Sequence, residues 1–338
     1  MSPRRATFAA IALAAALAGP ASAADDALRL DVSIAAFDPG VPADTARYRD
    51  LGVFPRIREI ESVLLPFALR DRLAASGDWG AVRVVPEPDA GAELLVTGRI
   101  LRSDGEVLEL AIRAVDATGR IWVERAFAGP AGGPDVYAAI AAALAEERAG
   151  LDAGALETVA TVSLLRYASW LAPTAFRGYL EEGPAGHYAL RRLPARDDPM
   201  LARIRRVRET EFVITDAIDA KFRELHGEIG AVYDVWRAYR RKNLEYQARS
   251  ETRAQSGGAN APRGSFEALK AQYDNYKWTR VVAQEQDRLA VAFDNEVGHK
   301  VEAMEIRVAE LEAWVDRKYA EWHRILEALF EAETAIER

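Results

Sequence analysis

The chain has 338 residues, half of them hydrophobic, and a formal net charge of -8, and this length suggests about two domains. The acidic balance argues against a general nucleic-acid-binding function, because phosphate contacts need a basic face. The sequence contains no cysteine, which excludes disulfides, thiol chemistry and a lipid attached through cysteine.

The first residues have the three-part pattern of a secretory signal peptide. Arg4 and Arg5 precede an apolar run over residues 6–18, and an A-x-A cleavage pattern ends at Ala23. Such a run is too short to span a bilayer, and small side chains fit the signal peptidase. We therefore expect residues 1–23 to be a cleaved signal peptide and the mature protein to be periplasmic. An uncleaved membrane anchor is the alternative.

Residues 24–150 predict a small α+β domain. Apolar residues alternate over five expected strands, near residues 28–34, 82–85, 93–102, 106–115 and 120–127. Asp104-Gly105 predicts a tight hairpin turn. Helical spacing predicts a helix over 57–75, with a kink or a division into two at Pro66, and an alanine-rich helix ends near Arg148. This order of elements predicts a sheet covered on one face by two helices.

Residues 151–198 predict a helical connector that is interrupted at Pro173. Three aromatic residues of this connector, Trp170, Phe176 and Tyr179, have a spacing that places them on one helical face. That face is either the seam between the sheet domain and the helices that follow or a groove that binds a partner or peptidoglycan.

Residues 199–338 predict a long antiparallel coiled-coil hairpin. Asp198-Pro199 is a typical helix start, and a Gly- and Pro-containing loop over 256–264 separates two apolar stripes with heptad-like spacing. The first stripe comprises Leu201, Ile204, Ile214, Ile218, Phe222, Leu225, Ile229, Val232, Trp236 and Tyr239. The second comprises Val297, Val301, Met304, Val308, Leu311, Val315, Trp322, Leu326 and Leu329.

Two features of this helical half suggest functional roles. Basic residues near the expected tip predict contact with anionic lipid headgroups or an acidic partner, the alternative being a merely soluble tip; they are Arg240, Arg241, Lys242, Arg249 and Arg253. Gly227, Gly230 and Gly298 would lie at one level of the hairpin. They predict a hinge, or else a place where the two backbones pack closely.

The sequence contains no pattern that indicates catalysis. Its four histidines are scattered, and it lacks the H-E-x-x-H, G-x-S-x-G and P-loop motifs. Carboxylates alternate with Lys and Arg along the expected helices, which is typical of a solvated face, although a glycosidase-like pair is the alternative. We expect no catalytic residue, no metal site and no cofactor.

Three stretches of the first domain carry a resemblance to a known family. They are the strand over 92–100, the strand over 108–115 with the following Asp116-Ala117-Thr118-Gly119-Arg120, and the helix with Val136 and Ile140. Residues 28–148 resemble the N-terminal domain of the Tol-system translocation protein TolB. Related domains occur in the curli secretion lipoprotein and a flagellar periplasmic ring protein. The resemblance implies envelope assembly through protein contacts, without catalysis. A helical half replaces the TolB β-propeller, so the Tol function is not carried over.

These observations predict a non-enzymatic docking or scaffolding component of a secretion, motility or division complex in the cell envelope. Its expected partners are envelope proteins and, peripherally, an anionic membrane surface. One alternative is a periplasmic adaptor or accessory subunit of a transport or efflux system. Another is a sensor that binds peptidoglycan or a ligand.

Overall fold

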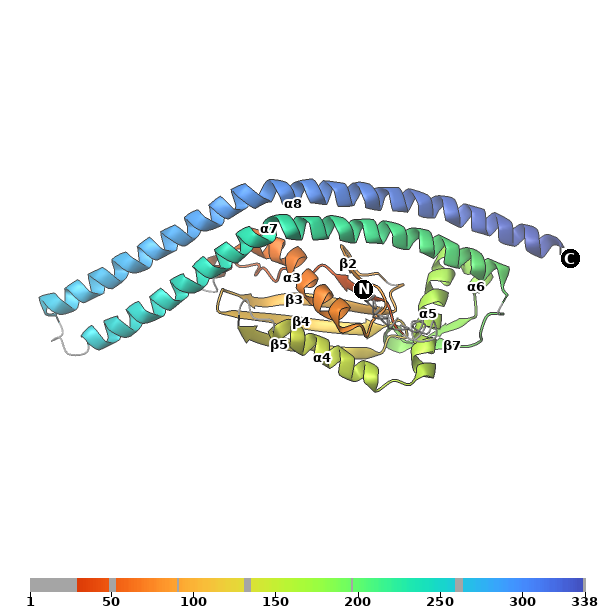
Figure 1. The fold of residues 1–338 in the computed structure, drawn as a ribbon, viewed down its shortest axis with the longest axis horizontal. Coiled ribbons are helices and arrows are strands. Elements are labelled where there is room, and N and C mark those ends of the chain that lie inside the picture. The colour runs from red at the N-terminus through yellow and green to blue at the C-terminus, as the bar shows by residue number, and fades with distance from the viewer. Residues whose placement is uncertain are drawn as a thin grey trace, which may run out of the picture.

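The computed structural model describes residues 29–48, 53–89, 91–130, 135–195, 197–258 and 264–336. The predicted signal peptide lies outside these ranges, as do residues 259–263 of the predicted hairpin loop. Figure 1 shows a sheet domain with two long helices running along it.

The sheet domain is built on a five-stranded mixed sheet with the strand order β2-β1-β3-β4-β5. β1 pairs in parallel with both β2 and β3, whereas β3, β4 and β5 form an antiparallel meander. The strands are β1 (Val32–Ala35), β2 (Val82–Val85), β3 (Leu94–Ser103), β4 (Val107–Asp116) and β5 (Ile121–Pro130). All five expected strands are present, and Gly105 has the positive φ, 98°, that a tight turn after β3 requires.

Two helices cover one face of the sheet, α3 (Pro55–Ser76) and α4 (Asp135–Ala149) (Figure 1). Along β4 every second side chain, such as Leu110 and Ile112, is buried beneath them, whereas Arg113 on the other face is exposed. This alternation is what a sheet with one packed face requires. The predicted α+β class is confirmed.

Of the two outcomes expected at Pro66, a kink or a division into two helices, the division does not occur, because α3 continues through Pro66 as one helix. A proline has no N–H, and Pro66 therefore leaves the carbonyl of Ser62 without its helical donor. The backbone N–H of Phe37, just after β1, donates to that carbonyl at 2.9 Å. A neighbouring segment thus satisfies the group that the proline frees.

A connector of short elements links the sheet domain to the long helices. Pro173 interrupts it as expected, because α5 ends before this residue and α6 begins with it. A two-stranded hairpin follows, which the sequence did not predict. The elements are α5 (Ala153–Leu171), α6 (Pro173–Phe176), β6 (Leu180–Glu182) and β7 (Tyr188–Leu190), with single turns of 3-10 helix at Pro184–Gly186 and, before α3, at Thr45–Arg47.

Two helices, α7 (Pro199–Gly258) and α8 (Phe266–Ile336), make up the C-terminal half. Their 60 and 71 residues correspond to lengths of about 90 Å and about 107 Å. They lie side by side and run in opposite directions (Figure 1). α7 begins at the predicted residue, where the Asp198 side chain accepts hydrogen bonds from the backbone N–H groups of Met200 and Leu201 at 2.9 and 3.1 Å.

The middle part of the first apolar stripe packs against the sheet domain. Phe222 lies 6.1 Å from Phe67 of α3, measured between ring centres. Trp236 packs edge-on against Phe54, just before α3, at 5.9 Å. Ile218, Leu225 and Ile229 join the same buried cluster. Heptad-like spacing marks an apolar helix face but does not identify the surface that covers it. A coiled-coil seam between α7 and α8 stays a prediction.

Candidate functional site

A buried polar cluster fastens α7 to the sheet domain. Its centre is Glu61 of α3, whose side chain is 1 % exposed. One carboxylate oxygen, Oε1, accepts hydrogen bonds from Ser103 Oγ at 2.7 Å, Tyr233 OH at 2.6 Å and Arg237 Nη1 at 3.1 Å. The other oxygen, Oε2, lies 3.8 Å from Arg58 Nε. Residues of α3, β3 and α7 therefore converge on one carboxylate.

The buried groups of this cluster shift one another's pKa values. Burial raises the pKa of the Tyr233 hydroxyl well above its ordinary value, and the Glu61 carboxylate raises it further. Burial alone would lower the pKa of Arg237, but the neighbouring Tyr233 and Glu61 groups outweigh it and raise that pKa. Both groups keep their protons at neutral pH, so the cluster joins α7 to α3 through a charged, hydrogen-bonded network.

Arg240 lies where α7 packs on the sheet domain and not at an exposed basic tip. Its prediction as a partner-binding residue is therefore wrong. Its side chain is buried, and its Nε donates to the carbonyl of Asp104 at 3.2 Å. A Cβ added at Gly105 would lie 2.7 Å from Arg240 Cγ. The turn after β3 therefore packs directly on α7. Of the other predicted basic residues, Arg241 and Lys242 are exposed.

The remaining two basic residues of that prediction, Arg249 and Arg253, lie on α7 nearer its end, and their side chains fall outside what the structure describes.

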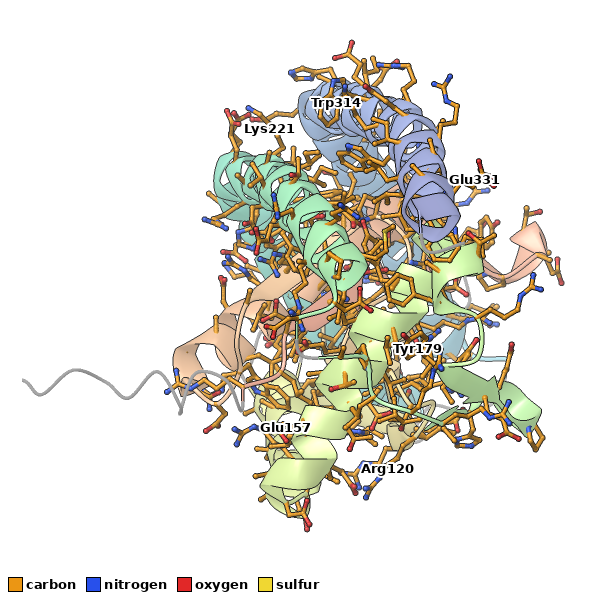
Figure 2. The ribbon with its side chains drawn as sticks, turned by 90° about the vertical axis from the view of Figure 1, so that its right-hand side faces the viewer. Arg120, Glu157, Tyr179, Lys221, Trp314 and Glu331 are labelled. Atoms are coloured by element: carbon orange, nitrogen blue, oxygen red, sulfur yellow. The ribbon has the colours of Figure 1, made fainter. Side chains whose placement is uncertain are left out.

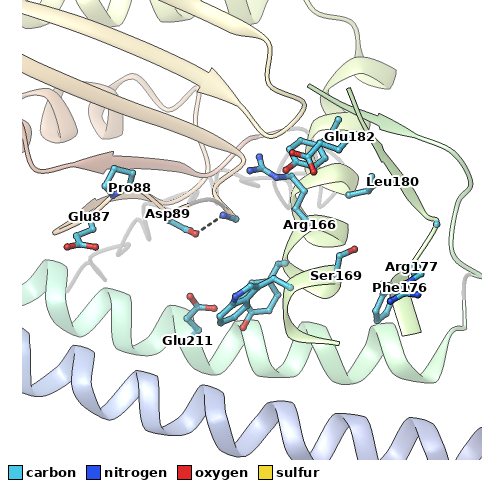
Figure 3. Close-up of a pocket in the computed structure, with 15 residues that line it drawn as sticks. Glu87, Pro88, Asp89, Arg166, Ser169, Phe176, Arg177, Leu180, Glu182 and Glu211 are labelled. Atoms are coloured by element: carbon cyan, nitrogen blue, oxygen red, sulfur yellow. Dashed lines mark hydrogen bonds between the residues drawn. The ribbon is translucent and has the colours of Figure 1, made fainter. Parts of the chain in front are cut away.

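A cavity of about 790 Å³ lies where the connector meets α7 (Figure 3). The segment after β2 provides Glu87 and Asp89, and α5 provides Arg166 and Trp170. Glu211 reaches the cavity from α7. Trp170 is half exposed and packs edge-on against His323 of α8 at 5.0 Å.

The charged groups around this cavity favour a cationic ligand. Four carboxylates line it, from Glu87, Asp89, Glu182 and Glu211, against the guanidinium groups of Arg166 and Arg177. Arg166 is already engaged, because its Nη1 donates to the carbonyl of Ala117 at 3.0 Å and its guanidinium lies 4.4 Å from the Tyr188 ring centre. Aromatic rings beside carboxylates bind amines well.

Phe176, predicted as a possible partner-binding residue, is buried between the connector and the long helices, where it also lines the cavity. It is 1 % exposed and packs in a cluster with Leu201 and Ile204 of α7 and Leu326 of α8. Of the two roles expected for the aromatic face, Phe176 has that of a seam between the connector and the long helices. The three aromatic residues also do not share one helix, because Trp170 lies on α5, Phe176 on α6 and half-buried Tyr179 beyond α6.

The loop end of the helical pair carries exposed apolar side chains that the sequence prediction missed. Phe266, Leu269, Tyr273 and Tyr276 of α8 are 59–81 % exposed. Their spacing of three, four and three residues is the signal that could have revealed them. Figure 2 views the pair along its length from the other end and shows Lys221 and Trp314 projecting from the side turned away from the sheet domain.

The described residues offer neither a metal cluster nor a membrane span. Across the described ranges, no group of three or more His, Asp or Glu side chains could hold a metal ion. Among the helices in those same ranges, none combines the length and apolar character that a bilayer crossing needs.

No family model matches this chain, and no curated protein or solved structure matches it significantly. The resemblance to the TolB N-terminal domain therefore stays a prediction.

Proposed function

We propose that this protein is a non-enzymatic docking or scaffolding component of a cell-envelope complex, which serves secretion, motility or division. The observation that carries the proposal is the loop end of the α7–α8 pair, which extends beyond the sheet domain (Figure 1) and exposes apolar side chains. A contiguous exposed apolar patch on a soluble domain marks an interaction surface.

The docked part of α7 supports this role by fixing the direction in which the helices extend. The Glu61 cluster and the apolar cluster around Phe222 hold α7 on α3. Arg240 contacts the turn after β3, and the loop end of the pair extends past the sheet domain (Figure 1). We call this part, residues 242–258 of α7 and 266–281 of α8, the distal segment. The sheet domain is the base, and the distal segment reaches the partner.

Export to the periplasm is part of the same proposal and rests on the N-terminal pattern. N-terminal sequencing of the protein from a periplasmic fraction should begin at Ala24. Recovery from the cytoplasm with Met1 intact would contradict export.

In-cell crosslinking tests the scaffolding role. A photo-crosslinking amino acid replaces Tyr273 in the distal segment or, as the control, Lys221, which is exposed on the docked part of α7 (Figure 2). A defined envelope protein should be captured from position 273 and not from position 221. Identical patterns of captured proteins from both positions would contradict the proposal.

The ligand-binding sensor remains a second candidate because of the cavity beside α5. Its acidic and aromatic lining favours an amine-bearing peptidoglycan fragment. Isothermal titration with such a fragment tests this function, with Glu211→Gln as the variant expected to weaken binding. Absence of heat with the wild-type protein would rule the fragment out.

A further inference from the structure

The first turns of α8 form an amphipathic surface with its large apolar side turned outward. Phe266, Leu269, Tyr273 and Tyr276 follow a 3-4-3 spacing, which places them on one face of the helix. Phe266 is 81 % exposed and Tyr273 is 64 % exposed. The small side chains of Ala268 and Ala271, on the opposite face, are partly buried. We call the four outward residues the aromatic stripe, after the three of them that are aromatic.

The charge around the aromatic stripe is opposite to that of the whole chain. The distal segment, residues 242–258 and 266–281, contains six Lys or Arg residues and four Asp or Glu residues, a local net charge of +2 in a chain of net charge -8. Lys270, Lys277 and Arg280 are exposed on the same helix. The Arg280 guanidinium lies 5.8 Å from the centre of the Tyr276 ring. The distal segment thus combines aromatic side chains with positive charge at one end of the molecule (Figure 1).

We propose that the aromatic stripe binds an anionic lipid surface, with its rings at the level of the headgroups and the neighbouring Lys and Arg residues on the phosphates. Tyr and Phe side chains beside basic residues are the composition that a helix lying in a bilayer interface requires. Each basic residue near the surface adds attraction to anionic lipid. Two copies of this basic segment would repel each other, which disfavours a symmetric contact between stripes.

This inference deepens the proposed function, because it names the surface that the distal segment reaches, and it rests on that segment being free of the sheet domain. Binding to vesicles measures it directly. The purified full chain is sedimented with vesicles of phosphatidylcholine, alone or with about a third phosphatidylglycerol. The wild-type protein should bind the anionic vesicles at least about tenfold more strongly, and salt near 1 M should remove this preference.

Two variants separate the aromatic and the charged contributions. Phe266→Ser with Tyr273→Ser should weaken binding by about tenfold or more. Lys270→Glu with Lys277→Glu should remove the preference for anionic lipid and leave the aromatic stripe intact. The matched control is Val213→Ser with Val235→Ser, which changes side chains of 67 and 68 % exposure on α7. The apolar N-terminal residues are identical in every variant. Differences in vesicle binding between the variants therefore come from the substituted side chains.

Equal binding of both vesicle types by the wild-type protein would overturn the lipid assignment. Distal-segment variants that bind vesicles as well as the control variant does would overturn it too. So would wild-type self-association that the Phe266→Ser, Tyr273→Ser variant loses, since the stripe would then bind a second copy. Capture of an envelope protein from position 273 together with an absence of vesicle binding would overturn this inference and support the scaffolding role. Vesicle binding without capture of any protein from position 273 would support the lipid inference and contradict the scaffolding role.

Discussion

At the scale of single residues, Glu61 links α3 to α7, because Tyr233 and Arg237 of α7 both donate hydrogen bonds to its carboxylate. Glu61→Gln removes the charge that compensates the buried guanidinium groups of Arg58 and Arg237. An uncompensated buried charge costs about 3–5 kcal/mol, so the free energy of unfolding should fall by an amount of that order. Urea unfolding followed by circular dichroism measures it.

The control for this prediction lies on the same helix. Glu59 also faces an arginine, Arg56 at 3.0 Å, but its side chain is 53 % exposed. Glu59→Gln should cost about 0.5 kcal/mol or less, because exposed ion pairs contribute little. Equal effects of the two substitutions would show that the Glu61 cluster does not hold the long helix in place.

Glu93, just before β3, predicts a dependence of stability on pH. Burial raises the pKa of its carboxyl group above the ordinary value of 4.5, although the hydrogen bond that it accepts from the Asp31 N–H acts in the opposite direction. A carboxyl group with a raised pKa binds its proton more tightly in the folded chain. It therefore favours folding below the unfolded pKa, and this contribution is lost as the pH rises through the folded pKa.

Gln at position 93 cannot ionise and escapes that loss. Glu93→Gln should therefore be more stable than wild type near pH 7, and the advantage should disappear near pH 4. Urea midpoints at the two pH values measure the difference. The exposed residue Glu87 provides the control. Glu87→Gln should change the urea midpoint, relative to wild type, by the same amount at both pH values. A Glu93→Gln advantage of the same size at both pH values would contradict the prediction.

At the scale of elements, α7 closes one edge of the sheet. The backbone N–H of Val84, on edge strand β2, donates to Asp219 Oδ1 of α7 at 3.1 Å. The other carboxylate oxygen of Asp219 binds Arg70 of α3 at 3.2 Å. An uncovered edge strand invites pairing with another chain, so α7 protects the domain as well as extending from it.

The surroundings of the two α7 glycines leave room for a side chain. Figure 1 shows that α7 and α8 each change direction along their length. In the sequence, Gly227 and Gly230 lie near the middle of α7, and Gly298 lies near the middle of α8. A Cβ added at Gly227 would meet nothing within 4 Å, and one at Gly230 would meet only the His226 ring, at 4.0 Å. The hinge itself stays a prediction.

Alanine should therefore be tolerated at both α7 glycines. Gly227→Ala with Gly230→Ala should raise the free energy of unfolding by roughly 0.5–1 kcal/mol per residue, because alanine favours the helix. Thermal unfolding measures the gain. Gly77→Ala is the control with the opposite expected sign, since Gly77 has a φ of 73° that alanine adopts with strain. A lower melting temperature for the double variant would instead indicate close packing.

At the scale of the whole molecule, the end of α8 returns to the connector of the same chain. Trp170 of α5 contacts His323 of α8, and Leu326 packs with α5 and α6. A domain-swapped dimer would place these contacts between two chains. In a chain without cysteine, Trp170→Cys with His323→Cys should crosslink within one chain when treated with a short bismaleimide. Crosslinks found only between chains, in denaturing electrophoresis, would contradict the fold-back.

The sequence by itself determined the local elements. Alternation marked the strands of the sheet, the Asp104-Gly105 pair marked a turn, and the Asp198 cap marked the start of α7. These features depend on contacts within a few residues or on the polarity of one face, and both are written in the local pattern. The same pattern does not contain the pairing of β1 with both β2 and β3, which depends on contacts distant in sequence.

Only the tertiary structure decided which surface covers each apolar or charged face. The stripe around Phe222 could have faced a second helix, but it packs in one buried cluster with Ile60 and Phe67 of α3. Arg240 and Phe176 are residue types that often bind partners at exposed surfaces, but both are buried here. The β3–β4 turn packs over Arg240, and α8 packs over Phe176. Periodicity encodes that a face is buried or exposed in general, and only long-range packing selects its partner.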